Sequence, residues 1–118
     1  MSNPILMKNF VAAAALEPSR IVVLSAADTA ALATSATAAS IGISDQIQVA
    51  AGQRIDVVVA GIADVTAGAA VAHGAPLTAD AQGRAVTAAA GNRVIGVALD
   101  AAAAAGDRIR CVIAHSVF

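Results

Sequence analysis

The side chains that could act as catalysts or metal ligands are few and scattered in this chain of 118 residues. His73 and His115 are its two histidines, and neither has a second histidine or a cysteine at a spacing that suits a metal ligand set. The single cysteine, Cys111, could act as a nucleophile only beside a histidine base in an electropositive setting. We interpret the histidines as surface or loop residues and expect no metal site.

The carboxylates and serines also lack the neighbours that catalysis requires. Asp56 and Asp107 stand near Arg54 and Arg108, where local ion pairing is the ordinary explanation. No nucleophile elbow surrounds any of three further candidates, which are Ser25, Ser44 and Ser116. We therefore expect no catalytic residue and no cofactor. A hydrolase is a third hypothesis, and loss of activity on mutating Asp107 or His73 would be needed to support it.

The composition predicts one small domain with a core of small side chains. Hydrophobic residues make up 58% of the chain and aromatic residues 2%, so alanine and branched aliphatic residues must fill the interior.

The net charge of −1, with charges spread singly, offers no basic stripe for nucleic acid. The mean hydropathy is +0.78, but the longest charge-free stretch, residues 29–44, is too short and too polar for a membrane span. A lone cysteine cannot form an internal disulfide, so the fold must be stable in a reducing cytosol.

An internal repeat is the strongest pattern in the sequence. Residues 41–60 match residues 95–114 at a constant offset of 54 without a gap, and nine of the twenty positions are identical. The same offset extends backwards, with residues 23–26 facing 77–80 and Leu32 facing Val86. A fixed period of this kind indicates duplication of one supersecondary unit. Cys111 faces Val57 in the repeat, which predicts that it serves as a small buried hydrophobic residue.

The periodicity favours strands although alanine favours helices. Residues 54–59 and 108–113 begin with polar and apolar residues in alternation, are rich in β-branched residues and follow a glycine at the same distance. Residues 20–25 and 93–99 are similar, and a turn at residues 80–83 precedes another short strand. We predict an all-β fold, a small barrel or sandwich built from two repeated halves.

Some segments leave alternatives open. The alanine runs 12–15 and 101–105 could each form a helical turn, so at most one or two short helices are expected. Residues 29–39 could be a loop or an edge strand. Structural turn glycines are expected at five positions, which are Gly42, Gly52, Gly83, Gly96 and Gly106.

The start of the chain is interpreted as a retained N-terminal arm over residues 1–18, followed by a single β domain over residues 19–118. Within that domain the repeat covers about residues 20–60 and 74–114. Pro4 favours an extended conformation at the residue before it, and we expect residues 1–10 to lie across a neighbouring subunit rather than fold back. A disordered terminus is the alternative. The predicted interface residues are Ile5, Leu6, Met7, Lys8 and Phe10.

Four segments of the second half, in this order, resemble a known family: residues 61–65, 75–84, 94–101 and 105–110. The likeness, which covers roughly residues 8–114, is to the small capsid cement or decoration proteins of tailed bacteriophages, formerly a family of unknown function. It implies a structural virion protein, made in the host cytoplasm, that binds the outside of the head and bridges major capsid subunits. It also implies self-association, with a homotrimer favoured over a dimer.

The alternative is a β-sandwich adhesive or carbohydrate-binding module on a virion or cell surface. Sugar binding usually depends on aromatic platforms, and the aromatic residues here are Phe10 and Phe118, near the two ends of the chain. The low aromatic content therefore favours the cement protein.

Overall fold

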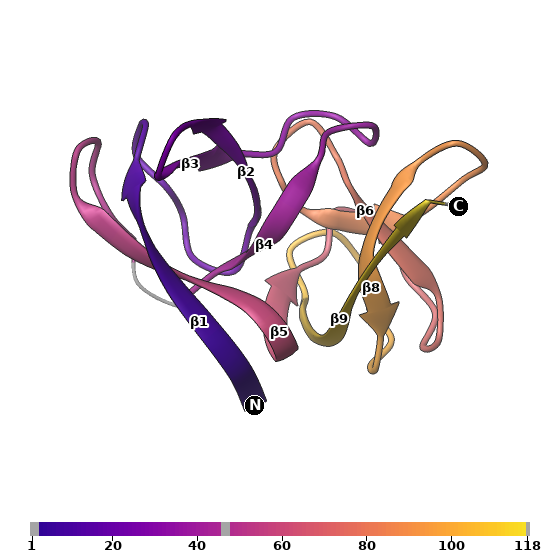
Figure 1. The fold of residues 1–118 in the computed structure, drawn as a ribbon. Coiled ribbons are helices and arrows are strands. Elements are labelled where there is room, and N and C mark those ends of the chain that lie inside the picture. The colour runs from indigo at the N-terminus through magenta and orange to yellow at the C-terminus, as the bar shows by residue number, and fades with distance from the viewer. Residues whose placement is uncertain (1–2, 46–47, 118) are drawn as a thin grey trace.

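Nine strands and no helix make up the described part of the chain, residues 3–45 and 48–117 of a computed structural model (Figure 1). The strands are β1 (Asn3–Ala12), β2 (Ile21–Ala26), β3 (Thr29–Leu32), β4 (Ser40–Ser44), β5 (Arg54–Thr66), β6 (Pro76–Ala79), β7 (Ala85–Thr87), β8 (Arg93–Ala98) and β9 (Arg108–Val117). The predicted all-β fold is confirmed, and most of the two alanine runs forms bends and turns instead of helical turns.

No helix among the described residues has the length and apolar character to span a membrane.

Strands β1 to β5 close into a five-stranded mixed barrel in the order β1-β3-β2-β4-β5, with β5 returning to β1. The pairing of β1 with β3 is parallel, and the other pairings in the barrel are antiparallel. The four further strands continue the sheet from β5 in the order β9-β8-β6-β7. Figure 1 shows the result as two lobes joined through β5.

The N-terminal segment is part of the barrel. β1 pairs with β5 from Asn3↔Ile62 to Val11↔Arg54, and Ala12 is buried in the barrel core. The expectation that residues 1–10 do not fold back is therefore wrong for residues 3–10, and residues 1 and 2 lie outside the described residues. The physical reason is that β5 would otherwise leave a row of unpaired backbone groups along a strand that the barrel needs for closure.

The two lobes repeat the same strand registers. In the first lobe Ile43 of β4 pairs with Val58 of β5. In the second lobe Val97 of β8 pairs with Val112 of β9, and both residues lie 54 positions later. We call residues 7–60 the first unit and residues 62–114 the second unit.

β1 also has a counterpart, the last part of β5. Met7 pairs with Val58 in the first unit, and Ile62 pairs with Val112 in the second. The parallel contact that closes each unit recurs as well, as Ala12↔Ala30 and Ala67↔Ala85. The predicted arm thus occupies the position of the first strand of a unit, and β5 serves both units in turn.

The backward extension of the repeat at an offset of 54 is wrong by one residue. Val22 pairs with Leu32, and Leu77 pairs with Thr87, so the offset is 55 in these hairpins. Leu77 therefore corresponds to Val22 and not to Val23. A shift of one residue exchanges the two faces of a strand, and only the offset of 55 aligns Leu77 with Val22, a residue that is also fully buried.

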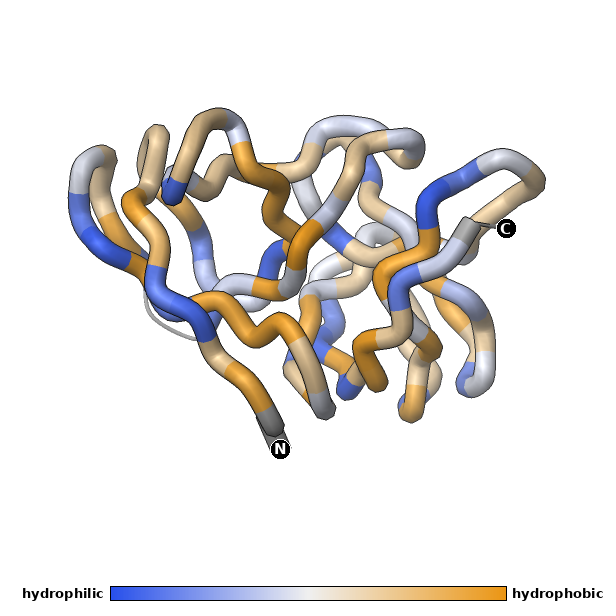
Figure 2. Tube along the Cα trace, viewed as in Figure 1, coloured by the Kyte–Doolittle hydropathy of each residue, from blue (hydrophilic) through white to orange (hydrophobic). Residues whose placement is uncertain are grey.

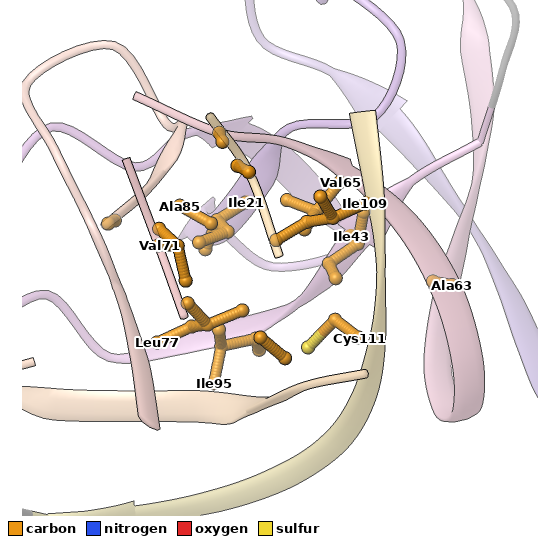
Figure 3. Packing of buried hydrophobic residues seen from close by; sticks show 14 of the residues in the cluster. Ile21, Ile43, Ala63, Val65, Val71, Leu77, Ala85, Ile95, Ile109 and Cys111 are labelled. Atoms are coloured by element: carbon orange, nitrogen blue, oxygen red, sulfur yellow. The ribbon is translucent and has the colours of Figure 1, made fainter. Parts of the chain in front are cut away.

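Two clusters of buried side chains form the core. The smaller lies inside the first unit and contains Ala12, Leu16, Val22, Ala30, Ile55 and Val57. The larger gathers residues of the second unit together with Ile21, Ala33, Ile43 and Val58 of the first (Figure 3). Figure 2 shows strongly hydrophobic residues along the strands of both lobes.

Gly42 and Gly96 are strand residues, so their prediction as turn glycines is wrong. They lie in β4 and β8, where a Cβ on either would collide with the carbonyl oxygen of the neighbouring strand, at Val58 and Val112 respectively. Close approach of two strands, and not positive φ, requires glycine here. The other three predicted glycines have positive φ, at Gly52, Gly83 and Gly106.

Candidate functional site

The outer side of β1 carries the exposed apolar residues that the sequence predicted for an interface. Leu6 is 56% exposed and Met7 is 39% exposed. The side chain of Ile5 lies outside the described residues. β1 pairs with β3 only at Val11 and Ala12, so within residues 3–10 the strand has β5 as its described partner. This edge can accept another extended chain, because no second described strand pairs with it along residues 3–10.

Charged residues beside this edge are paired, with two cations sharing one carboxylate. The Lys8 ammonium lies 3.7 Å from a carboxylate oxygen of Asp28 and 5.2 Å from the centre of the Phe10 ring. Arg54 donates to the same carboxylate at 3.1 Å, and its Nε donates to the side-chain oxygen of Asn9. The hydrogen bond from Arg54 is the main reason that the pKa of Asp28 is lowered. The edge therefore offers apolar contacts with its charges already paired.

The candidate catalytic residues are not gathered into a site. His73 lies in an exposed loop and His115 in an exposed part of β9. Asp107 accepts hydrogen bonds from the backbone N–H groups of Ala103 and Ala104, at 2.9 and 3.2 Å, which gives it a role in a turn. Across residues 3–45 and 48–117, no three His, Cys, Asp or Glu side chains cluster so that they could hold a metal ion.

Cys111 is fully buried, with its side chain in the larger core cluster. Burial raises the pKa of its thiol to about 12, so the thiolate that a nucleophile needs is scarce at neutral pH. Asp56, the last carboxylate considered, accepts a hydrogen bond from the Asn9 side chain at 3.0 Å. Cys111 therefore serves in core packing, and Asp56 serves in a hydrogen bond at the surface.

The hollows on the surface are small. One of about 180 Å³ is lined by Ser40, Arg93, Val94, His115 and Ser116. Another of about 140 Å³ is lined by Asn9, Asp45, Val49, Arg54, Ile55 and Asp56. Both are below the roughly 300–1,000 Å³ of usual ligand pockets. Neither of these two hollows is large enough to enclose an ordinary small-molecule ligand.

A sequence profile of the phage cement proteins matches residues 4–113. The chain belongs to the phage cement protein family. This family is structural and not enzymatic, and a cement protein belongs on the exterior of the virion head, where it binds the capsid. The resemblance inferred from the sequence is thereby confirmed. A search of curated proteins finds no match.

Among solved structures, the chain is similar to the head fiber gp8.5 N base of bacteriophage phi29. The TM-score is 0.74 with 21% sequence identity, over 96% of this chain and 97% of that chain. At this identity the likeness supports the fold alone. The likeness extends over nearly the whole length of the cement protein.

Sequence reasoning missed the exposed apolar residues of the second unit. Val97 and Leu99 are 37% and 38% exposed, and both lie in the segment 93–99 that was predicted as a strand without regard to its surface. The counterpart of Leu99 in the repeat is the polar Asp45, which indicates that this position can be exposed, whereas the counterpart of Val97 is the apolar Ile43, which gives no such signal. The two units therefore share the same strand pairing at these positions but differ in which side chains are exposed.

Proposed function

We propose that this cement protein binds the outer surface of the assembled head, bridges neighbouring major capsid protein subunits and stabilises the shell. The family match over residues 4–113 is the observation that carries the proposal. The exposed Leu6 and Met7 on the outer edge of β1 supply an apolar contact. Ile5 precedes them in β1, and Lys8 and Phe10 follow them; the five residues are the set predicted from sequence.

The energetics favour many modest contacts over one strong contact. A specific interface buries roughly 1,200–2,000 Å² in total. Burying one large apolar side chain fully contributes roughly 1.5–3 kcal/mol before ordering costs are subtracted. On a repetitive shell, a protein that bridges two subunits gains further affinity because its second contact is intramolecular. Self-association, as a homotrimer in preference to a dimer, would multiply this gain.

Co-sedimentation with heads assembled without the protein tests the proposal. The double variant Leu6→Asp/Met7→Asp removes the apolar contact, and Leu24→Asp is the matched control, because Leu24 is 48% exposed in a different strand. We expect the double variant to lose occupancy by at least about tenfold in Kd, the equivalent of 1.4 kcal/mol, and the control to bind like the unmodified protein. Equal binding of all three proteins would remove β1 from the capsid contact.

The alternative, a carbohydrate-binding module, predicts a different outcome. In that case the unmodified protein would bind a glycan array and would not sediment with heads. Phe10 is half-buried against the core of the first unit, which leaves it a poor platform for a sugar ring. Binding to heads without binding to glycans is the result that we expect.

A further inference from the structure

A row of three apolar residues crosses the outside of the first unit. Ile21 pairs with Ile43, and Ile43 pairs with Val58, so the three lie side by side on adjacent strands. Their chain neighbours Val22 and Val57 belong to the core of the first unit, whereas the row belongs to the larger cluster with residues of the second unit. The row therefore faces away from its own unit and is covered by the other one.

Figure 3 shows this contact from close by. Ile21 and Ile43 point into the cluster that includes Val65, Leu77 and Ile109 of the second unit. The exposed fraction is 0% for Ile21 and Ile43 and 3% for Val58. Packing of one unit on the outer row of the other is thus a built contact of this fold, with no polar side chain in the row.

The second unit carries the same row with less cover, since Pro76 and Val112 are half-buried. Pro76 pairs with Val97, and Val97 pairs with Val112, in the register of Ile21, Ile43 and Val58. Val97 is 37% exposed, while Ile43 at the same position is fully buried. Leu99, beyond the end of β8, adds a second exposed apolar side chain at 38%.

The first unit is less buried than the second at one equivalent end. In the second unit Ala63, Val65 and Ile95 are at most 2% exposed and belong to the cluster that receives the row. Their counterparts in the first unit are Lys8, Phe10 and Ile41, of which Lys8 is exposed and the other two are half-buried. We call these three residues the receiving end.

We infer that the row Pro76, Val97 and Val112 of one copy packs on the receiving end of a second copy, repeating between chains the contact that joins the two units within one chain. The occupant is a second copy because this fold already places one unit on this row. Lys8 can remain at the rim of such a contact, with its ammonium beside Asp28 in water and its aliphatic part on the apolar surface.

The contact is head-to-tail, since the two surfaces are different parts of the chain. Interfaces of this type close into rings or extend into filaments, and the proposed homotrimer would be a closed ring. The inference rests on the self-association in the proposed function and names the surfaces that make it.

Light scattering of the purified full chain tests the inference. The unmodified protein should exceed the protomer mass of 11.4 kDa, and Val97→Asp should reduce it to the protomer mass. Leu24→Asp, the same change on β2, should leave the mass unchanged. A monomeric unmodified protein at high concentration, or an assembly unaffected by Val97→Asp, would overturn the inference.

Mixing two variants tests the head-to-tail geometry. Phe10→Asp blocks the receiving end and keeps the row, whereas Val97→Asp blocks the row and keeps the receiving end. Each alone should be monomeric, and a 1:1 mixture should give a species of two copies. If Phe10→Asp fails to fold by circular dichroism, Lys8→Glu replaces it, because Lys8 is outside the core. A mixture that stays monomeric would contradict the geometry.

Sedimentation with heads separates the two proposals. If the unmodified protein binds heads but is monomeric in solution, the inference fails and the proposed function stands. If it assembles through Val97 but never binds heads, the proposed function fails and the named interface stands.

Discussion

Gly42 in β4 and Gly96 in β8 lie against equivalent carbonyl groups, those of Val58 and Val112, 54 residues apart. The two glycines let β4 and β8 approach their neighbours in the same way in both units. The agreement is one of backbone geometry, and it extends to the side chain beside each glycine, which is Val57 in one unit and Cys111 in the other.

Replacing either glycine by alanine should destabilise the protein. Gly42→Ala and Gly96→Ala each add a methyl group against a backbone carbonyl that cannot move aside, and overpacking of this kind costs about 1–3 kcal/mol. The midpoint of urea unfolding measures the loss. Gly52→Asn is the control. Gly52 has a positive φ, which asparagine tolerates better than most residues, and its surroundings are open. Equal stability of all three variants would contradict the close approach.

Cys111→Val should be nearly neutral in stability. Val57 already occupies the equivalent position beside Gly42, and volume-conserving core substitutions usually cost less than about 1.5 kcal/mol. Thermal unfolding monitored by circular dichroism gives the comparison. A large loss of stability or of head binding would point to a role for the thiol itself.

The Cys111 thiol should also resist alkylation in the folded protein. Burial raises its pKa to about 12 and leaves it 0% exposed, so both the thiolate and the access route are lacking at pH 7. Iodoacetamide labelling followed by mass spectrometry should show modification only after denaturant is added. Rapid labelling under native conditions would show that the core opens around β9.

Ser44→Ala should destabilise the first unit. The buried Ser44 hydroxyl accepts a hydrogen bond from the backbone N–H of Arg20 at 2.9 Å and donates one to the carbonyl of Glu17 at 2.8 Å. Leaving a buried donor unsatisfied costs about 1–3 kcal/mol. Ser25→Ala, at an exposed serine, is the control for the urea midpoint. No difference between the two variants would mean that other groups replace the hydroxyl.

Deleting residues 1–12 should abolish folding. The deletion removes β1, which closes the barrel with β5 and β3, and it removes Phe10 and Ala12 from the first core cluster. A domain with about 5–15 kcal/mol of total stability cannot lose one of five barrel strands. Circular dichroism with a thermal scan checks this outcome. A truncated protein that still unfolds cooperatively would restore the view of this segment as an arm.

The strands were predictable where β-branched residues alternate with polar ones. Residues 54–59 and 108–113 have that pattern, and both are strands in β5 and β9. β1 was missed as a barrel strand because its counterpart, residues 62–67, shares only one identity with residues 7–12, the alanine at Ala12 and Ala67. The repeat becomes visible there only through the pairing of β1 and of the end of β5 with their neighbouring strands. A single sequence does not show which strands pair.

The slip of one residue between the hairpins was hidden by composition. Alanines are so frequent in both halves that offsets of 54 and 55 fit almost equally well, whereas the buried pair Val22 and Leu77 decides between them once the register is known. The apolar side chains at Leu6 and Met7 could be predicted as candidates for a contact. The exposure of Val97 could not, because it depends on which unit covers the other.

The sharing of β5 has a mechanical consequence. Its thirteen residues would span roughly 40 Å if straight, more than the 35 Å length of the molecule, and Gly61, with φ of 96°, lies within the strand at the passage from one unit to the next. A force on one unit is therefore carried into the other by continuous backbone and its ladder of hydrogen bonds. If the protein bridges two capsid subunits as proposed, a shift of the shell beneath one unit would be transmitted through β5 to the other unit.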